Sequence, residues 1–169
     1  MIRLAKNEEI DKILELTLAC AHKMTAKGIL QWNEDYPSQA AFENDIERKE
    51  LYVLEDGGNI IGCIVISTFK DFIYNEIKWL TQEDKPAIYI HRLAVHPDNQ
   101  GQGNAQKLMS FAENWAKKGD FRSVRLDTFS QNPRNNQFYE KRGYHKLGDV
   151  NFPKQSKHPF HCYELLLNS

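Results

Sequence analysis

The spacing of apolar residues changes several times along the chain and marks the predicted helices and strands. A three-four spacing, typical of an amphipathic helix, follows Asn7, a residue type that often caps a helix. The apolar positions of this first helix are Ile10, Ile13, Leu14, Thr17, Leu18 and Ala21. A short helix is expected over residues 38–49, and a longer one begins after Gly103 and ends at Gly119.

Apolar and β-branched runs bounded by turn residues predict the strands. Residues 51–54 and 60–67 are expected to form a hairpin, because residues 56–59 (Asp-Gly-Gly-Asn) are typical of a tight turn. The second of these strands is apolar on both faces, which predicts a central place in the sheet. Further strands are expected over residues 2–5, 88–95, 124–128, 144–150 and 160–167.

A last helix is predicted from its two ends. Asn132, Pro133 and Gly143 stand at the N-cap, first-turn and C′ positions that these residue types favour, and Phe138 is expected on the buried face. The order of elements predicts an α/β fold, a mixed sheet flanked by helices on both faces. The chain shows no repeat, so residues 1–169 are predicted to form one domain.

The charge and cysteine content of the chain limit the classes of partner and environment that are expected. Lysine and arginine number 22 against 23 acidic residues, so no strong field favours nucleic acid or a membrane surface. The cysteines Cys20, Cys63 and Cys162 are far apart and form no CxxC pair, which is typical of reduced thiols. The first residues lack a signal-peptide apolar segment, and no apolar run approaches a membrane span. A cytoplasmic protein without a metal site is therefore expected.

Residues 100–105 (Gln-Gly-Gln-Gly-Asn-Ala) carry the strongest chemical signal. They connect an apolar predicted strand to the start of an amphipathic helix. Glycines let a ligand approach the main chain closely because they have no Cβ. The first N–H groups of a helix lack intrahelical partners and lie at the positive end of the helix dipole. This turn therefore predicts a site for a phosphate or pyrophosphate group.

Two common phosphate-binding patterns do not match this turn. The P-loop pattern G-x-x-x-x-G-K-[ST] is absent, and the dinucleotide pattern G-x-G-x-x-G has Gln106 where its third glycine is required. The acidic residue that the dinucleotide pattern needs about 20 positions further on could only be Asp120. That residue falls in a predicted turn rather than at a strand end. Another class of phosphate ligand is therefore indicated.

The turn fits the pattern Q-x-x-G-x-A, preceded by a strand and His96-Pro97. Two blocks carry a wider likeness, YIHRLAVHPDNQGQGNAQKLMSFAENWAKKG and RLDTFSQNPRNNQFYEKRGY, and the second places Asn132 and Tyr139 seven residues apart. Over residues 89–144 the chain resembles the GNAT superfamily of acyl-CoA-dependent N-acyltransferases. This resemblance implies a GNAT-like fold with a central, mostly antiparallel sheet. Two neighbouring central strands would splay apart, and the pantetheine arm of CoA would lie in the gap.

The resemblance also implies which residues bind acetyl-CoA. N–H groups of the turn would hold the CoA pyrophosphate, and the main chain of the preceding strand would pair with the pantetheine arm. A main-chain N–H near Val95 would polarise the thioester carbonyl. Asn132 would contact pantetheine or the acceptor, or serve only as a helix cap. The implied cofactor-binding residues are Leu93, Val95, Gln100, Gly101, Gln102, Gly103, Asn104, Ala105 and Asn132.

Two positions test these implications. A side chain at Gly103 is expected to clash with the phosphate while hardly affecting the fold. Asn135 stands where the family pattern N-x-x-A-x-x-x-Y has alanine, so packing beside CoA departs from the family there.

Tyr139 is the predicted catalytic residue. Transfer to an amine expels a thiolate whose pKa is about 8.5, and a phenol with a pKa of about 10 can supply the proton. The alternative is that Tyr139 is only a buried aromatic residue. The general base stays unassigned, and its candidates are His91, Glu76, Asp127, His158 and His161.

The predicted function is transfer of an acetyl group from acetyl-CoA to a primary amine by direct attack in a ternary complex. Acidic and aromatic residues at 32–37 and 74–79, with the segment near His158, are expected to form the acceptor pocket. The acceptor, a small molecule or a peptide, and the acyl chain length stay open. The resemblance allows a homodimer. A non-catalytic acyl-CoA-binding or sensing module is the alternative.

Overall fold

The computed structural model describes residues 1–168, and the contacts within it divide the chain into two compact units. The first unit comprises residues 1–66 and 91–112, and the second comprises residues 67–90 and the chain from residue 113 onward. Two strands and one helix contribute residues to both units. That residues 1–169 form a single domain stays a prediction.

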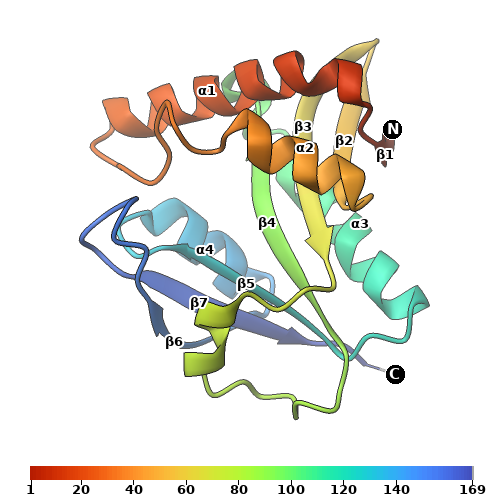
Figure 1. Ribbon diagram of the computed structural model, residues 1–169, viewed down its shortest axis with the longest axis vertical. Helices are drawn as coiled ribbons and strands as arrows, with labels where there is room; N and C mark the ends of the chain where they lie inside the picture. The colour runs from red at the N-terminus through yellow and green to blue at the C-terminus, as the bar shows by residue number, and fades with distance from the viewer. Residues whose placement is uncertain (169) are drawn as a thin grey trace. The chain divides into compact units, whose positions relative to one another are not determined.

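The first unit carries most of the predicted N-terminal elements (Figure 1). They are β1 (Ile2–Leu4), the 3-10 helix η1 (Asn7–Glu9), α1 (Ile10–Ala26), α2 (Gln39–Glu47), β2 (Leu51–Asp56), β3 (Asn59–Ser67), the second half of β4 (Ala87–Val95), η3 (Pro97–Asn99) and the first half of α3 (Asn104–Lys118). The strands follow the order β1-β2-β3-β4. Pairs β1–β2 and β2–β3 are antiparallel, and β3 lies between two neighbours as predicted.

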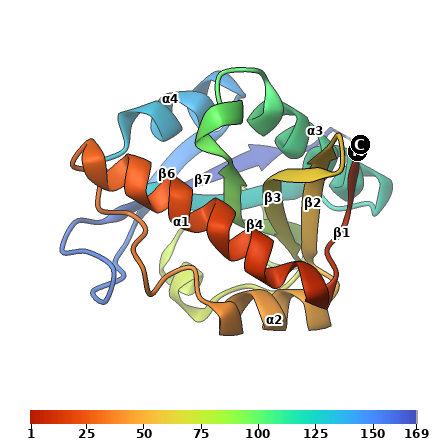
Figure 2. The same ribbon diagram turned by 90° about the horizontal axis from the view of Figure 1, so that it is seen from above.

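Successive side chains of a strand point to opposite faces of the sheet, and in this unit they meet helices on each face. Leu51 and Val53 of β2 pack in one core cluster with residues of α1 and α2. On the opposite face, the ring of Tyr52 lies 5.1 Å from that of Phe111 on α3. A Cβ added at Gly62 of β3 would lie 3.1 Å from the Leu108 side chain of α3. Helices therefore cover both faces of this part of the sheet, as Figure 2 also shows.

The N-terminus of the first helix differs from the sequence prediction. Asn7 does not cap it, because the chain first forms η1, for which Lys6 is the N-cap. The buried stripe of α1 is largely as predicted, with Ile10, Ile13, Thr17 and Ala21 buried, but it also includes Leu16 and Cys20, whereas Leu18 is 39% exposed. The second predicted helix is confirmed, with the Ser38 hydroxyl accepting a hydrogen bond from the Ala41 N–H at 3.1 Å.

The second unit continues the sheet with the remaining strands. Its further elements are η2 (Phe72–Glu76), β5 (Ser123–Phe129), α4 (Pro133–Lys141), β6 (His145–Val150) and β7 (Phe160–Leu166). Strand β5 pairs antiparallel with β7, and β7 pairs antiparallel with β6. Strands β4 and β5 are parallel, and their ladder covers only three residue pairs. The strand order is therefore β1-β2-β3-β4-β5-β7-β6, a seven-stranded mixed sheet.

In the second unit, different elements pack on the two faces of the sheet. Tyr163 of β7 faces α4, because its hydroxyl donates to the Asn136 side chain at 2.7 Å. The next pair along the ladder, Asp127 and Cys162, points to the opposite face. There the Tyr74 hydroxyl of η2 donates a hydrogen bond to the Asp127 carboxylate.

Helix α4 has the predicted ends but not the predicted buried residue. The Asn132 side chain accepts from the Asn135 N–H at 3.2 Å, and Gly143 follows the helix with a φ of +97°. Phe138 is only half-buried, whereas Tyr139 is 6% exposed. The helix rotates Tyr139 toward the tyrosine rings of β6 and β7, so Tyr139 and not Phe138 belongs to the buried face.

The described residues also bear on the environment of the chain. Among residues 1–168, the structure contains no helix with the length and apolar character needed to cross a membrane. Cys20, Cys63 and Cys162 are all buried and not disulfide-bonded.

Candidate active site

The glycine turn has the backbone conformation that its sequence predicts. Gly101 and Gly103 adopt φ values of +76° and +83°, in the left-handed region that favours glycine. The N–H of Lys107 bonds to the carbonyl of Gly103 at 3.1 Å, so the N–H groups of Asn104 and Ala105 precede this first helical bond. The turn thus presents main-chain donors at the N-terminus of α3, the arrangement that suits a phosphate.

The space around these glycines corrects one expectation. A Cβ at Gly101 or Gly103 would meet no protein atom within 4 Å, so the main chain is open to a ligand there. The positive φ at Gly103 nevertheless strains any L-residue at this position. A substitution therefore costs stability as well as disturbing a phosphate, and the expectation of an almost unaffected fold is wrong.

Side chains of the turn anchor it rather than extend into the open space. Gln100 donates through Nε2 to the Val95 carbonyl at 2.9 Å and accepts from Lys23 Nζ at 2.8 Å. Asn104 is buried and donates through Nδ2 to the Asn99 carbonyl at 2.9 Å. These contacts hold the turn against α1 and the end of β4, which leaves ligand contacts to its main chain.

A hydrogen bond at the end of β4 defines which way the main-chain N–H groups of this strand point. The N–H of His96 donates to the Ile61 carbonyl of β3 at 2.8 Å. Because successive residues of a strand point to opposite edges, the N–H groups of Val95 and Leu93 face away from β3. The Val95 carbonyl accepts the thiol of Cys20 at 3.1 Å as well as the Gln100 amide.

Arg92 lies within β4 but has a left-handed backbone φ. Its φ is +49°, an uncommon value for a residue other than glycine, asparagine or aspartate. Its guanidinium forms a two-point ion pair with Asp45 of α2, with Nε–Oδ2 2.8 Å and Nη2–Oδ1 2.7 Å. Burial by itself lowers the pKa of Arg92, but the hydrogen bonds that it donates to Asp45 raise it overall. The pair is charged and largely removed from solvent.

Sequence reasoning did not assign a role to Asp45. The available signal was its spacing, because Asp45 stands three residues after Phe42 on the apolar side of a short helix. An acidic residue at such a position is expected to have a buried partner.

Asn132 and Tyr139 belong to the second unit. Burial and the nearby Asp127 charge raise the pKa of Tyr139 above its usual range, while Arg142 acts in the opposite direction. Among residues 1–168, the structure gives the Tyr139 hydroxyl no hydrogen-bond partner, and every buried side-chain nitrogen or oxygen atom has one. Tyr139 is therefore a buried residue whose hydroxyl is not committed to another described residue.

The candidate bases lie in different surroundings. Asp127 accepts from Tyr74, and His161 Nδ1 lies 2.6 Å from Asp149 Oδ1. His158 is exposed, with its ring 6.3 Å from that of Phe129, and Glu76 is exposed at the end of η2. His91 is half-buried on β4. Nothing in these placements selects one of them, so the base stays unassigned.

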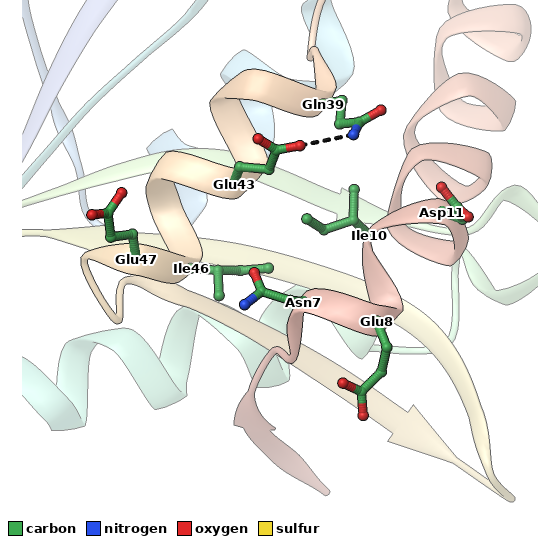
Figure 3. A pocket seen from close by; sticks show the side chains of 8 residues that line it. All are labelled: Asn7, Glu8, Ile10, Asp11, Gln39, Glu43, Ile46 and Glu47. Carbon is green, nitrogen blue, oxygen red and sulfur yellow. Dashed lines mark hydrogen bonds between the residues drawn. The ribbon is translucent and has the colours of Figure 1, made fainter.

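One cavity lies apart from all of these residues within the first unit. It has a volume of about 630 Å³ and lies between the start of α1 and helix α2 (Figure 3). Its lining residues are Asn7, Glu8, Ile10, Asp11, Gln39, Glu43, Ile46 and Glu47. None of them is a predicted site residue. Among residues 1–168, no three His, Cys, Asp or Glu side chains are grouped so as to hold a metal ion.

A strand that ends in a glycine turn, with a helix that begins on that turn, is an arrangement that suits a phosphate-containing ligand. The sequence model of the Acetyltransferase (GNAT) family matches residues 8–144. The chain therefore belongs to the GNAT acetyltransferase family, and the predicted family, fold and enzyme class are confirmed.

Individual relatives agree with this assignment. The chain is 25% identical to the S-(2-succino)cysteine N-acetyltransferase of Bacillus subtilis, over 90% of this chain and 88% of that protein. A GNAT-family acetyltransferase of Streptococcus agalactiae superimposes with a TM-score of 0.85 at 24% identity, covering 100% of this chain and 96% of the other. The acetyltransferase yncA of Salmonella typhimurium, solved with acetyl-CoA, matches with a TM-score of 0.72 at 18% identity, covering 100% and 94%.

The donor set of this chain fits the cofactor of its family. The glycine turn offers main-chain N–H groups and no Cβ, as a pyrophosphate requires. The protein is thus an acetyltransferase of a family that uses acetyl-CoA.

Proposed function

We propose that this chain transfers an acetyl group from acetyl-CoA to a primary amine by direct attack in a ternary complex. The observation that carries the proposal is the Tyr139 hydroxyl, whose pKa is raised by burial and which no hydrogen bond among the described residues engages. A binding module needs no protonated phenol at this place, whereas expulsion of a thiolate does.

The main chain of the first unit supplies binding and polarisation. N–H groups of residues 101–105 bind the pyrophosphate, with Gln100 and Asn104 fixing the turn from behind. Leu93 and Val95 of β4 present their N–H groups to the pantetheine arm and the thioester carbonyl. Because negative charge develops on that oxygen during attack, a fixed N–H stabilises the transition state more than the substrate.

Tyr139 completes the proton balance. The neutral amine attacks the carbonyl carbon, the C–S bond breaks, and the phenol gives its proton to the departing sulfur. The amine loses protons to an unassigned base or to water. Asn132, at the N-terminus of the helix that carries Tyr139, either contacts pantetheine or acts only as the cap of that helix.

No cysteine fits an acyl-enzyme mechanism. Burial raises the pKa of Cys20 to about 11, and it raises those of Cys63 and Cys162 further. A thiol acts as a nucleophile through its thiolate, and the thiols of Cys20 and Cys63 are instead held as neutral donors. Direct attack by the amine needs no such nucleophile.

The acceptor is proposed to be a cationic amine. Glu34 and Asp35 are exposed in the loop between α1 and α2, where carboxylates attract an ammonium group. The name of the Bacillus subtilis relative makes S-(2-succino)cysteine one amine to include in a panel with polyamines, amino acids and peptide N-termini.

The test is release of free CoA thiol from acetyl-CoA across that panel. Tyr139→Phe should lower amine-dependent release about 100-fold or more, as expected for loss of a general acid. Tyr163→Phe is the matched control, because its ring lies 6.1 Å from that of Tyr139 but its hydroxyl is engaged by Asn136. Binding of CoA without release by any amine would favour the non-catalytic module.

A further inference from the structure

We propose that Asp45 is a positioning residue that acts through Arg92 to hold β4 in the conformation needed for its N–H groups to polarise the thioester. The inference rests on the proposed function, since it assumes that Leu93 and Val95 supply these N–H groups. It adds a residue on α2 whose carboxylate contacts the Arg92 guanidinium.

The first observation is strain in the strand. A left-handed φ at a residue with a Cβ is unfavourable, and it persists only where the surroundings hold it. Arg92, with a φ of +49°, stands directly before Leu93 and three residues before Val95. Relaxation of Arg92 to an extended conformation would rotate the peptide planes that follow it. The directions of the proposed donors therefore depend on what holds Arg92.

The second observation is the geometry of the Asp45 contact. Both carboxylate oxygens are engaged by the guanidinium, at 2.8 and 2.7 Å, and the Asp45 side chain is only 4% exposed. A planar fork bound at two points fixes orientation as well as distance. The third guanidinium nitrogen, Nη1, donates to the Tyr36 hydroxyl at 3.2 Å. The Arg92 side chain is thus held from α2 and from the loop that precedes it.

The third observation is that two thiols hold the carbonyls of the same segment. Cys63 of β3 donates to the Arg92 carbonyl at 3.4 Å, and Cys20 of α1 donates to the Val95 carbonyl at 3.1 Å. Each carbonyl lies next to a proposed donor along the chain. The side chain and the main chain of Arg92 are therefore both fixed. Such fixation is expected of a strand whose N–H groups must point at the thioester carbonyl.

Stability alone is a weak reason for this ion pair. A buried ion pair loses hydration that its mutual attraction often only balances, and apolar replacements can be as stable. A role in orientation accounts for the two-point geometry and for its place beside a strained residue. The two explanations make different predictions for catalysis.

The test compares Asp45→Asn with the wild type, and Glu9→Gln serves as the matched control. Glu9 forms a two-point pair with Arg3 in the same unit, at 2.9 and 2.7 Å, away from β4. Three quantities are measured: kcat, KM for acetyl-CoA, and the infrared stretching frequency of bound acetyl-CoA labelled with ¹³C at its thioester carbonyl. A hydrogen bond from an N–H lowers this frequency, so it reports the aim of the donors directly.

Asp45→Asn should lower kcat about 10- to 100-fold, leave KM for acetyl-CoA within about twofold, and return the carbonyl frequency toward that of the free cofactor. Glu9→Gln should leave all three quantities within about twofold of the wild type. A second change, Arg92→Gly, should recover part of kcat in the Asp45→Asn protein, because glycine adopts a positive φ without strain. Arg92→Lys, which keeps the charge but not the fork, should act like Asp45→Asn.

An unchanged carbonyl frequency in both Asp45→Asn and Arg92→Lys would overturn the inference, whatever happened to stability. If the carbonyl frequency of acetyl-CoA bound to the wild type equalled that of free acetyl-CoA, the proposed function of β4 itself would be overturned. In that case the N–H groups would not polarise the thioester, although Tyr139-dependent release could persist.

Discussion

The rings of Tyr139, Tyr144 and Tyr163 lie close together in the second unit, but only two of their hydroxyls are bonded to a neighbouring side chain among the described residues. Tyr144 donates to Glu113 at 2.9 Å, and Tyr163 donates to Asn136 at 2.7 Å. Among residues 1–168 the structure shows no such partner for Tyr139, whose ring lies 5.8 Å from that of Tyr144. A phenol that gives a proton must not be committed to another acceptor. This distinction at single residues separates the proposed acid from its neighbours.

The raised pKa of Tyr139 predicts the alkaline side of the activity profile. Because its pKa is above the ordinary value of about 10, the phenol stays protonated throughout the range in which amines lose their protons. We expect kcat/KM for the amine to rise with pH to about 9 and not to fall by about pH 10. A descending limb below about pH 10 that disappears in Tyr139→Phe would contradict this expectation. Initial rates of thiol release between pH 6 and 10 measure it.

At the scale of elements, the turn before α3 can be tested with a matched pair of glycines. Gly103 and Gly58 have the same φ of +83°, and an added Cβ would meet no protein atom within 4 Å at either. Alanine should therefore lower the free energy of unfolding similarly at both positions, by about 1–2 kcal/mol. Only Gly103→Ala should raise KM for acetyl-CoA, about tenfold, because only its methyl group disturbs phosphate contacts.

Urea denaturation and initial-rate kinetics give both quantities for the two variants. Equal KM values for Gly103→Ala and Gly58→Ala would remove the turn from the binding site.

The start of α4 allows a separate test of Asn132. Serine keeps the cap of this helix, so Asn132→Ser should leave the free energy of unfolding within about 0.5 kcal/mol. If the amide also contacts the cofactor, KM for acetyl-CoA should rise about fivefold or more. Ser38→Ala, which removes the cap of α2, should cost about 1 kcal/mol without a change in KM. Thermal unfolding and titration with acetyl-CoA would separate a cap from a ligand contact.

At the scale of the whole molecule, each unit has its own buried ion pair. In the second unit, Arg125 donates to the Glu164 carboxylate at 2.9 Å, with side chains 4% and 0% exposed. Burial by itself raises the pKa of Glu164, but hydrogen bonds from Thr81, Ser123 and Arg125 lower it overall. The stability gained from this lowered pKa is present above about pH 4.5 and is lost as the solution becomes more acidic.

Glu164→Ala tests whether the chain unfolds as one domain. Removing the carboxylate leaves Arg125 buried without its counter-charge, which should cost about 3–5 kcal/mol. In a single cooperative domain, Trp32 of the first unit must report this loss. We expect the urea midpoint of Trp32 fluorescence to fall together with that of far-ultraviolet circular dichroism, measured in protein carrying Trp79→Phe and Trp115→Phe.

The same Trp79→Phe, Trp115→Phe protein with Glu164 intact is the reference. A Trp32 midpoint that does not move, while part of the dichroism signal is lost early, would show that the two units unfold separately.

Much of the fold could be predicted because its signals are local. The hairpin at residues 56–59 and the caps of α4 depend on residue types within a few positions, and both are confirmed. The central place of β3 follows from its apolar residues on both faces. The stripe predicted for α1 is largely confirmed, but Leu18 is exposed, and Leu16 and Cys20 are buried as well.

By itself, the sequence determined the family and the location of the glycine turn, since glycine spacing and a following helix are properties of contiguous residues. It also indicated Tyr139, although not that Tyr139 replaces Phe138 on the buried face. Only the tertiary structure decided that Asp45 meets Arg92, 47 residues apart. Such a pair depends on where the fold brings α2 and β4, and Arg92 has a left-handed φ at that pair. Long-range contacts of this kind leave no pattern in neighbouring residues, so they become visible only in the folded chain.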